Sequence, residues 1–415
     1  TLKKAESLAA KLWGADYARF STGGSTHANQ AIIFALGKPG DKVAVSRTAH
    51  RSVLSALVLA GLEPIWMSPE IDAATGVPIG IGIAELKRAL SEKPIAVLLT
   101  EPGYLGTISD LPVLIEAAHA VDVPVILDAA WGGHFGFHPQ LPKHAFQVGA
   151  DALITSTHKA LPGYSASALL LARTTLLSAE RLEQSFETTH TTSPAGAPLA
   201  SIDGVRALLE TRGEELIGAL LTNIHRFKEM VQAEFALPIF LYATDFPEGR
   251  FDPSKIVLRV QQLGASGVEI EQDLQAKGIR VEMADRDTIV FLATLADTRE
   301  DFQALADALI PILKRRQEQR RESATALSWS VVPTRGISMR DAYFAKTEMV
   351  EASKAEGRIS ADLIAPYPPG VAVVAPGEIL TAQILEGLKA SKDAGVRIAY
   401  ATDSSLSHYR IVIRD

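Results

Sequence analysis

The sequence contains no cysteine among its 415 residues. The absence of thiols excludes disulfides, cysteine-ligated zinc, iron–sulfur clusters and a cysteine nucleophile. Long hydrophobic runs are also missing, because stretches such as residues 54–62 are much shorter than the roughly 20 apolar residues that span a bilayer. We therefore expect a cytoplasmic protein without membrane helices or a metal centre, whose chemistry uses groups other than thiols.

The chain has no strong excess of either charge. It carries 41 Lys and Arg against 48 Asp and Glu, a net charge of −7. Binding to nucleic acid needs a clustered excess of basic residues, so we expect no nucleic-acid partner. The hydrophobic fraction of 47% and charged fraction of 21% are typical of a folded globular protein. The length favours two or three domains.

Short apolar runs alternate with helical patterns over the first 175 residues. The runs predict strands at residues 43–46, 64–67, 95–100, 124–128, 152–156 and 168–171. Between them a 3.6-residue period predicts helices at residues 28–36, 52–60, 83–90 and 113–121. Continuous apolar strands separated by helices indicate a mainly parallel sheet sandwiched by helices, the α/β class.

The rest of the chain predicts two smaller regions. We expect a large ligand-binding domain at residues 1–236, mostly helical from residue 174 except for a loop at 188–198, then a small α/β domain at 237–325 and a C-terminal region at 326–415. In the small domain, strands are expected near residues 255–260, 278–282 and 288–292, and a helix at 300–316. The charged residues 314–322 are typical of a solvated helix end. Because the chain begins with Thr1, we also expect that an N-terminal segment is missing.

Polar residues follow two of the predicted parallel strands and precede the first long helix of the sheet. Ligands bind beyond the carboxyl ends of such strands, where Asp128 and Lys159 are expected. In the stretch 21–26, two glycines allow close backbone approach, Ser25 and Thr26 offer hydroxyls, and the following helix presents free N–H groups. These features indicate a phosphate site, although the same stretch is also typical of a simple helix cap.

A lysine that shares a crevice with a carboxylate and a phosphate loop favours one particular chemistry. Such a lysine can form a Schiff base with the phosphorylated aldehyde pyridoxal 5′-phosphate. Asp128 would then keep the pyridine nitrogen protonated, so that the ring can accept an electron pair. Taken singly, Lys159 is also compatible with a solvated surface lysine and Asp128 with a turn or helix cap.

Six motifs in this order resemble the fold type I pyridoxal-phosphate enzymes, and specifically the Orn/Lys/Arg decarboxylase family. They are residues 21–29, 47–52, 128–138, 156–159, 191–194, and 367–370 together with 376–378. The resemblance extends over essentially the whole chain. It implies the fold type I transferase fold with a smaller C-terminal α/β region.

The resemblance also implies roles for individual residues. Lys159 would form the internal aldimine and Asp128 would pair with the pyridine nitrogen, while His50 stacks on the ring and Trp131 lies near its phenolic oxygen. The phosphate would be held by Ser25, Thr26, Ser156 and His158. Thr191 and Thr192 would reach the site of a neighbouring subunit, which implies a homodimer or a higher homo-oligomer. Taken singly, His50 is also compatible with a helix cap and Trp131 with a core aromatic, but the order of the motifs makes both alternatives weaker.

The implied reaction is α-decarboxylation of lysine, arginine or ornithine, as in polyamine biosynthesis, giving a diamine or agmatine and carbon dioxide. Lys159 or His158 would return the proton to the substrate Cα. The alternatives are a fold type I aminotransferase, another pyridoxal-phosphate lyase, or a catalytically silent protein of this fold. Gly103 stands where the family usually has Thr, and Ala195-Gly196 where it usually has Ser-Tyr, so the substrate side of the pocket departs from the family pattern.

The cationic end of a basic substrate needs a carboxylate partner in a desolvated pocket. Asp128 is committed to the cofactor, so we expect the partner elsewhere. Glu378 is the candidate, because it lies in a turn-rich stretch of the family pattern. A solvent-facing loop glutamate is the alternative.

Overall fold

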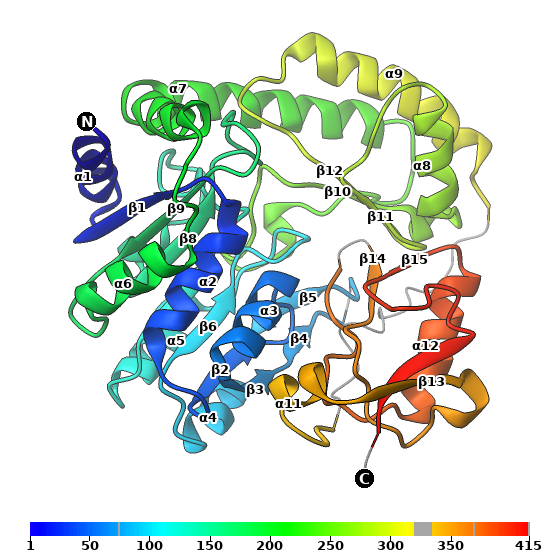
Figure 1. The fold of residues 1–415 in the computed structure, drawn as a ribbon. Helices are drawn as coiled ribbons and strands as arrows, with labels where there is room; N and C mark the ends of the chain where they lie inside the picture. Colours follow the sequence, from blue (N-terminus) through cyan, green and yellow to red (C-terminus); the bar gives the residue numbers. More distant parts are fainter. Residues whose placement is uncertain (74, 319–333, 368–369, 414–415) are drawn as a thin grey trace.

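The computed structural model describes all residues except 74, 319–333, 368–369 and 414–415 (Figure 1). The first region is the part of the chain up to and including the first half of the long helix at residues 196–232, and a seven-stranded sheet forms its centre. The strand order is β1-β9-β8-β7-β6-β2-β3. The strands are β1 (Tyr17–Ser21), β2 (Lys42–Ser46), β3 (Glu63–Met67), β6 (Val97–Thr100), β7 (Val125–Asp128), β8 (Ala152–Ser156) and β9 (Ala168–Ala172). The five strands from β8 to β3 are parallel, which confirms the predicted mainly parallel sheet. β9 runs antiparallel to both neighbours, and β1, which was not predicted, is one of the two edge strands.

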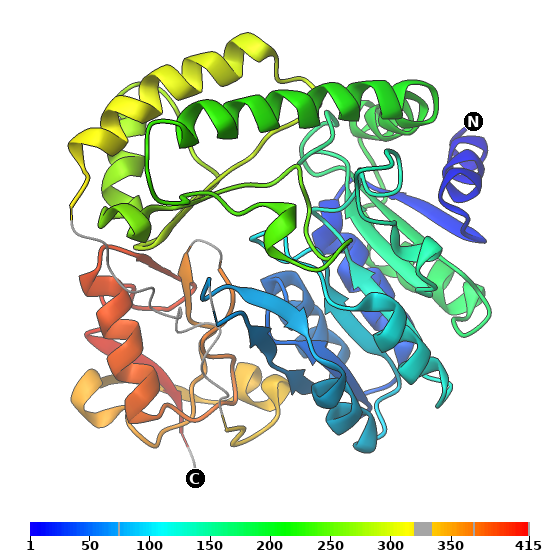
Figure 2. The ribbon, with the colours of Figure 1, turned by 180° about the vertical axis from the view of Figure 1, so that it is seen from behind.

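Helices cover both faces of this sheet because alternate strand residues point to opposite sides. On one face, Ile126 of β7 packs in a cluster with α2, α3 and α6, whereas Val125 and Leu127 pack on the other face with α1, α4, α5 and α7. The helices are α1 (Leu2–Trp13), α2 (Gly24–Leu36), α3 (Arg51–Ala60), α4 (Ile83–Ser91), α5 (Leu111–His119), α6 (Ala179–Thr189) and α7 (Gly196–Gln232). Figure 2 shows the long α7 continuing from the first region over the second.

The second region, which extends from β10 to α9, is built on a small antiparallel sheet of order β10-β12-β11. Its strands are β10 (Ile256–Arg259), β11 (Met283–Ala284) and β12 (Thr288–Phe291). It packs against α8 (Gly267–Gln275), α9 (Arg299–Arg315) and the second half of α7. The strand predicted at 278–282 was wrong in its bounds. Residues 278 and 279 still belong to the turn that ends α8, since Gly278 has a φ of +79° and the Ile279 N–H bonds the Leu274 carbonyl.

The C-terminal region contains two small antiparallel sheets. β13 (Thr347–Glu351) pairs with β16 (His408–Val412), and β14 (Ala365–Tyr367) pairs with β15 (Arg397–Ala399). Its helices are α11 (Met339–Phe344) and α12 (Ala382–Asp393). The remaining elements are the hairpin β4 (Pro69–Ile71) and β5 (Pro78–Ile81) and the short 3-10 helices η1 (Ala145–Gln147), η2 (Ala243–Asp245), η3 (Val260–Leu263) and η4 (Ala352–Lys354). Within the described residues, no helix combines the length and apolar character needed to cross a bilayer.

A buried ion pair joins the C-terminal region to the central sheet. Arg47, which follows β2, donates from Nη1 and Nη2 to the two carboxylate oxygens of Glu378 at 2.7 and 2.9 Å, and both side chains are only 3% exposed. The same guanidinium also donates to the Val373 carbonyl and stacks over Trp66. The Ala375 N–H donates to Glu378 as well. Glu378 is therefore fully engaged by the protein and is not free to bind a substrate cation in this structure, contrary to the expectation from sequence.

We predict that Glu378→Gln lowers the free energy of unfolding by about 3–5 kcal/mol, because Arg47 would remain buried without its counter-ion. Denaturant titration measures the loss. Glu348→Gln is the matched control, since its partner Arg358 is exposed and such a surface pair contributes at most about 1 kcal/mol. Equal losses in the two variants would contradict the structural role of the buried pair.

Candidate active site

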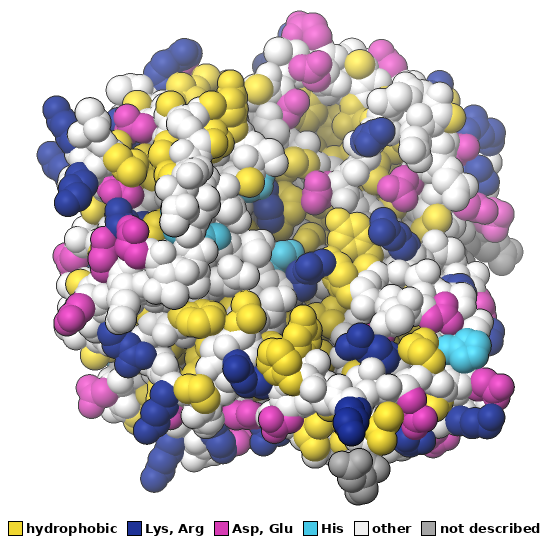
Figure 3. All heavy atoms as spheres, viewed as in Figure 1, with side chains coloured by type: hydrophobic (Ala, Val, Ile, Leu, Met, Phe, Trp, Pro, Cys, Tyr) yellow, Lys and Arg dark blue, Asp and Glu magenta, His cyan; other side chains and the backbone are white. Residues whose placement is uncertain are grey.

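A cavity of about 320 Å³ lies beyond the carboxyl ends of β7 and β8. Eight residues predicted from the sequence line it together: Ser25, Thr26, His50, Asp128, Trp131, Ser156, His158 and Lys159. They come from the starts of α2 and α3, from the carboxyl ends of β7 and β8, and from the segments that follow these strands. Figure 3 shows this face of the molecule hollowed near its centre, where the sheet meets the two smaller regions.

The start of α2 forms one end of the cavity. Gly23 is the N-cap residue and makes no side-chain cap, so the helix-cap alternative for Ser25 and Thr26 does not apply. Instead, the Ser25 hydroxyl lies 2.7 Å from that of Ser156. Gly24 has a φ of +66° and its N–H bonds the Ala166 carbonyl, which fixes the turn. Hydroxyls and a helix N-terminus that point into one cavity suit a phosphate group.

Asp128 lies elsewhere in the cavity, at the end of β7, and is 2% exposed. Asn29 donates from Nδ2 to Oδ2 at 2.9 Å, and the Ala130 N–H donates to Oδ1 at 3.3 Å. The bond from Ala130 shows that Asp128 also stabilises the turn after β7, which was its alternative interpretation. A nearly buried carboxylate with lone pairs to spare favours a cationic N–H donor, and a protonated pyridine nitrogen is such a donor.

Asn29 links Asp128 to His50. Its Nδ2 also donates to the Ser52 hydroxyl at 3.0 Å, and that hydroxyl lies 2.8 Å from His50 Nδ1. The Ser52 backbone N–H donates to the same Nδ1, so His50 caps α3, which confirms its alternative interpretation. The same histidine also lines the cavity. With Nδ1 accepting, the ring proton sits on Nε2. Burial lowers the pKa of His50, and Lys159 lowers it further against the opposing effect of Asp128.

Lys159 is a partly buried amine rather than a solvated surface lysine. Its Nζ lies 4.1 Å from the centre of the Trp131 ring. Burial lowers the pKa of Lys159, while the carboxylates of Asp128 and Glu282 oppose that effect. A lowered pKa increases the fraction of the neutral amine, which is the form that attacks an aldehyde.

His158 precedes this lysine and is held by the backbone. Its Nδ1 lies 2.8 Å from the Ser167 carbonyl, so Nδ1 carries a proton and Nε2 remains for a ligand. Burial lowers the pKa of His158, and the neighbouring Lys159 contributes to the lowering. An anionic ligand at Nε2 would favour the protonated ring, which can donate from that nitrogen.

Three expected residues lie outside this cavity. Thr191 and Thr192 are exposed in the segment between α6 and α7, and Glu378 is paired with Arg47 as described above. The Pro-Pro pair at 368–369 of the Tyr367 motif falls outside the described residues.

The sequence analysis missed other residues near Lys159. Asn29 belonged to a recognised motif but had no role, and Tyr104 and Thr100 also line the cavity. Glu282 acts electrostatically on both Lys159 and Tyr104. Desolvation raises the pKa of Glu282, and Lys159 and Lys255 lower it. Nothing in the local sequence marks Glu282, because it approaches the site from the second region, where it immediately precedes β11.

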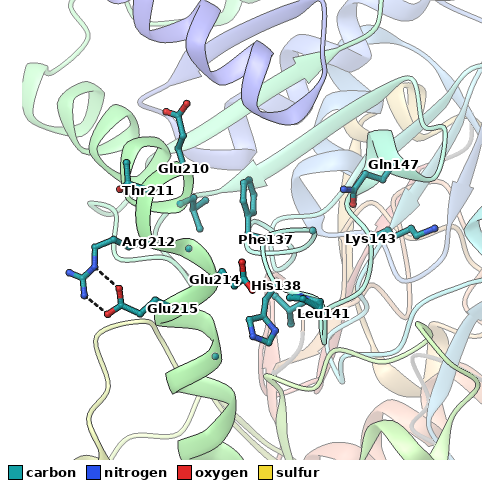
Figure 4. Close-up of a pocket in the computed structure, with 15 residues that line it drawn as sticks. Phe137, His138, Leu141, Lys143, Gln147, Glu210, Thr211, Arg212, Glu214 and Glu215 are labelled. Carbon is teal, nitrogen blue, oxygen red and sulfur yellow. Dashed lines mark hydrogen bonds and ion pairs between the residues drawn. The ribbon is translucent and has the colours of Figure 1, made fainter.

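A wider hollow of about 1140 Å³ lies elsewhere, between α7 and residues 136–147 (Figure 4). Its charged residues include Arg212 and Glu215, which pair with each other along α7 at 2.7 Å. Lys143 is exposed there. Unlike the cavity at β7 and β8, this hollow contains none of the residues expected to bind a cofactor.

The donors of the smaller cavity fit pyridoxal 5′-phosphate. Hydroxyls and a helix N-terminus suit its phosphate, Lys159 its aldehyde, and Asp128 its ring nitrogen. His50 and Trp131 supply aromatic surface for its ring.

Comparison with known proteins identifies the family of this chain. Residues 1–301 match the sequence profile of the Orn/Lys/Arg decarboxylase major domain, and residues 325–398 match that of the family's C-terminal domain. Arginine decarboxylase of Bacillus subtilis is 34% identical over 99% of this chain and 85% of its own length. The Bacillus anthracis arginine decarboxylase is 33% identical with the same coverage.

A solved structure shows the same fold. Lysine decarboxylase of Francisella novicida superposes with a TM-score of 0.84 at 21% identity, over 99% of this chain and 72% of that one. The overall architecture is that of the fold type I pyridoxal-phosphate enzymes. The sequence profiles, the relatives and the fold together show that this chain belongs to the Orn/Lys/Arg decarboxylase family.

Proposed function

We propose that the chain removes the α-carboxylate of arginine, with pyridoxal 5′-phosphate bound in the cavity at the ends of β7 and β8. The observation that carries this proposal is the placement of the Lys159 amine and the Asp128 carboxylate, from neighbouring strand ends, in one cavity. Arginine is favoured among basic amino acids by the 33–34% identity to arginine decarboxylases of Bacillus.

The residues that would hold the cofactor divide by chemistry. Ser25, Thr26, Ser156 and His158 would bind the phosphate, and Asp128 the ring nitrogen. His50 would pack on the ring with its orientation fixed by Ser52. The ring, when bound, supplies an electron sink for the pair left behind as carbon dioxide departs.

Asp128 and Lys159 are the residues that we propose to act on the ring charge and on the substrate proton. Asp128, held by Asn29, stabilises positive charge at the ring nitrogen. Lys159 is the group that we favour as proton donor to the substrate Cα, because His158, held through Nδ1 by the Ser167 carbonyl, would use its Nε2 for the phosphate.

The composition of the cavity favours decarboxylation over transamination. No arginine is found among the described residues that line it. An aminotransferase would normally hold the substrate α-carboxylate with such a residue, and that contact would stabilise the charge which a decarboxylase must remove in the transition state.

Glu282 takes the place of Glu378 as the proposed partner of the substrate guanidinium. The proposal rests on its electrostatic effect on two residues that line the cavity: its carboxylate favours the charged form of Lys159 and adds to the effect of burial in raising the pKa of Tyr104, although Glu282 does not itself line the cavity. A guanidinium prefers a carboxylate that it can bind through two parallel hydrogen bonds. The exposed Thr191 and Thr192 are proposed to approach the site of a second copy in a homodimer.

The proposal is tested by supplying arginine, lysine and ornithine separately to the enzyme loaded with pyridoxal 5′-phosphate. Arginine should give one agmatine for each carbon dioxide, faster than the other two substrates react. Formation of a keto acid without carbon dioxide would instead identify an aminotransferase.

We predict that Lys159→Ala loses the visible absorbance of the bound cofactor and its turnover. Borohydride treatment followed by peptide mapping should fix the cofactor to Lys159 in the parent and to no peptide in the variant. Lys143→Ala, at an exposed lysine of the wider hollow, is the control and should behave like the parent. Labelling of another lysine in the parent would show that the assignment is wrong.

We predict that Asp128→Asn retains bound cofactor but lowers kcat by about 100-fold or more, because a neutral amide cannot stabilise the positive ring nitrogen. Turnover is compared at equal cofactor occupancy. Asp203→Asn, on the outer face of α7, should leave kcat unchanged. A variant at position 128 with near-normal kcat would exclude the proposed role.

We predict that Glu282→Gln raises the KM for arginine by about tenfold, equivalent to about 1.4 kcal/mol, with little change in the cofactor absorbance. Initial-rate kinetics measure the effect. Glu348→Gln, in the C-terminal region, is the control for a surface glutamate. An unchanged KM would remove Glu282 from the substrate site.

A further inference from the structure

Lys255 lies next to a residue of the site, Trp131, but has no role in the proposed chemistry. It immediately precedes β10 in the second region and is 5% exposed. Its Nζ lies 3.6 Å from the centre of the Trp131 ring, and the Nζ of Lys159 lies 4.1 Å from the same centre. The two amines are therefore at most about 8 Å apart. Trp131 lines the cavity, whereas Lys255 does not.

The surroundings of Lys255 fix its side chain. Gly106 has a φ of +92°, and a Cβ there would lie 2.7 Å from Lys255 Cγ, so the stem of Lys255 occupies the space that a side chain would need. The Lys255 carbonyl accepts a hydrogen bond from Lys228 Nζ at 2.8 Å. The stem of Lys255 is thus confined beside Gly106, with its amine against the indole.

A buried polar cluster borders this lysine. The Asp252 carboxylate is fully buried and accepts from the Ser254 hydroxyl at 2.6 Å. His134 Nε2 lies 2.9 Å from the same hydroxyl. His134 belongs to the 128–138 motif, so this cluster connects the segment after β7 with the chain that leads to β10.

We propose that Lys255 is a positioning residue for the reaction: its ammonium group holds the Trp131 indole against the cavity, and its positive charge disfavours a second cation at Lys159. This inference deepens the proposed function and rests on it. A cation over an indole face is attracted by the ring, most strongly where water is excluded.

Electrostatics support the second half of the proposal. Burial lowers the pKa of Lys255 to about 8; Asp252 opposes this effect, Lys159 adds to it, and Glu282 opposes it. Repulsion between two ammonium groups is mutual, so Lys255 acts on Lys159 in the same sense. Lys159 also faces Asp128 and Glu282, which favour its charged form.

Two histidines are further titratable groups near Lys159. The pKa values of His50 and His158 are both lowered, and Lys159 contributes in each case. Both rings are therefore mainly neutral near pH 7, so neither adds a positive charge beside Lys159, and Arg51 is a further cation next to His50.

The test measures how fast the cofactor-free full-length protein captures pyridoxal 5′-phosphate between pH 6 and pH 10, followed by the visible absorbance. Capture needs the neutral amine, so its rate rises with pH through the pKa of Lys159. In Lys255→Met the midpoint should move up by about one pH unit, because the loss of a like charge raises that pKa. Lys255→Arg keeps a positive charge over the whole pH range and should leave the midpoint at or below that of the parent.

The controls separate charge from packing. Superimposable profiles for Lys255→Met and the parent overturn the proposal, and so does an equal shift in Lys255→Arg, which would indicate packing alone. If Lys255→Met fails to fold by circular dichroism, Lys255→Gln supplies a charge-free variant with the same expected shift. Capture by Lys159→Ala as fast as by the parent would overturn the proposed function itself, independently of Lys255.

Discussion

The carboxylate of Asp128 is the constraint around which the site is arranged. At 2% exposure it has lost most of its contact with water. A positively charged partner for it must therefore come from within the cavity. Asn29 donates to one oxygen and the Ala130 N–H to the other, which fixes the carboxylate without supplying a positive charge. A buried carboxylate held in this way favours a cationic ligand at that position, and a protonated pyridine nitrogen meets the requirement.

The parallel sheet explains why the other groups are near this carboxylate. β7 and β8 are adjacent and end at the same edge, so Asp128 and the segment leading to Lys159 emerge side by side. The sheet alone does not complete the site, because Glu282 and Lys255 come from the second region. The buried pair of Arg47 and Glu378 then fixes the C-terminal region against the sheet, three residues before His50.

Much of the first region could be predicted from the sequence because its signals are local. Apolar runs located six of the seven strands to within about two residues, and strand-end polar residues located most of the cavity. β1 escaped prediction because it is a partly exposed edge strand rather than a buried apolar run. β11 was misplaced because it is only two residues long and follows directly on a helix-ending turn.

The errors in the site have a different origin. Glu378 was assigned to the substrate because its motif was recognised, but its partner Arg47 lies 331 residues away and no local pattern pairs them. Glu282 and Lys255 were missed for the same reason, since their approach to Lys159 depends on how the second region packs on the first. The chemistry of strand ends is visible in one segment of sequence, whereas contacts between regions become visible only in three dimensions.

The central claim, that Asp128 keeps the cofactor ring nitrogen protonated, is tested most directly by nitrogen-15 NMR of the enzyme loaded with pyridoxal 5′-phosphate labelled at that nitrogen. The account predicts a resonance at the position of a protonated pyridine that persists through neutral pH. It also predicts that the resonance moves to the neutral position in Asp128→Asn. A neutral-pyridine resonance in the parent enzyme would contradict the account.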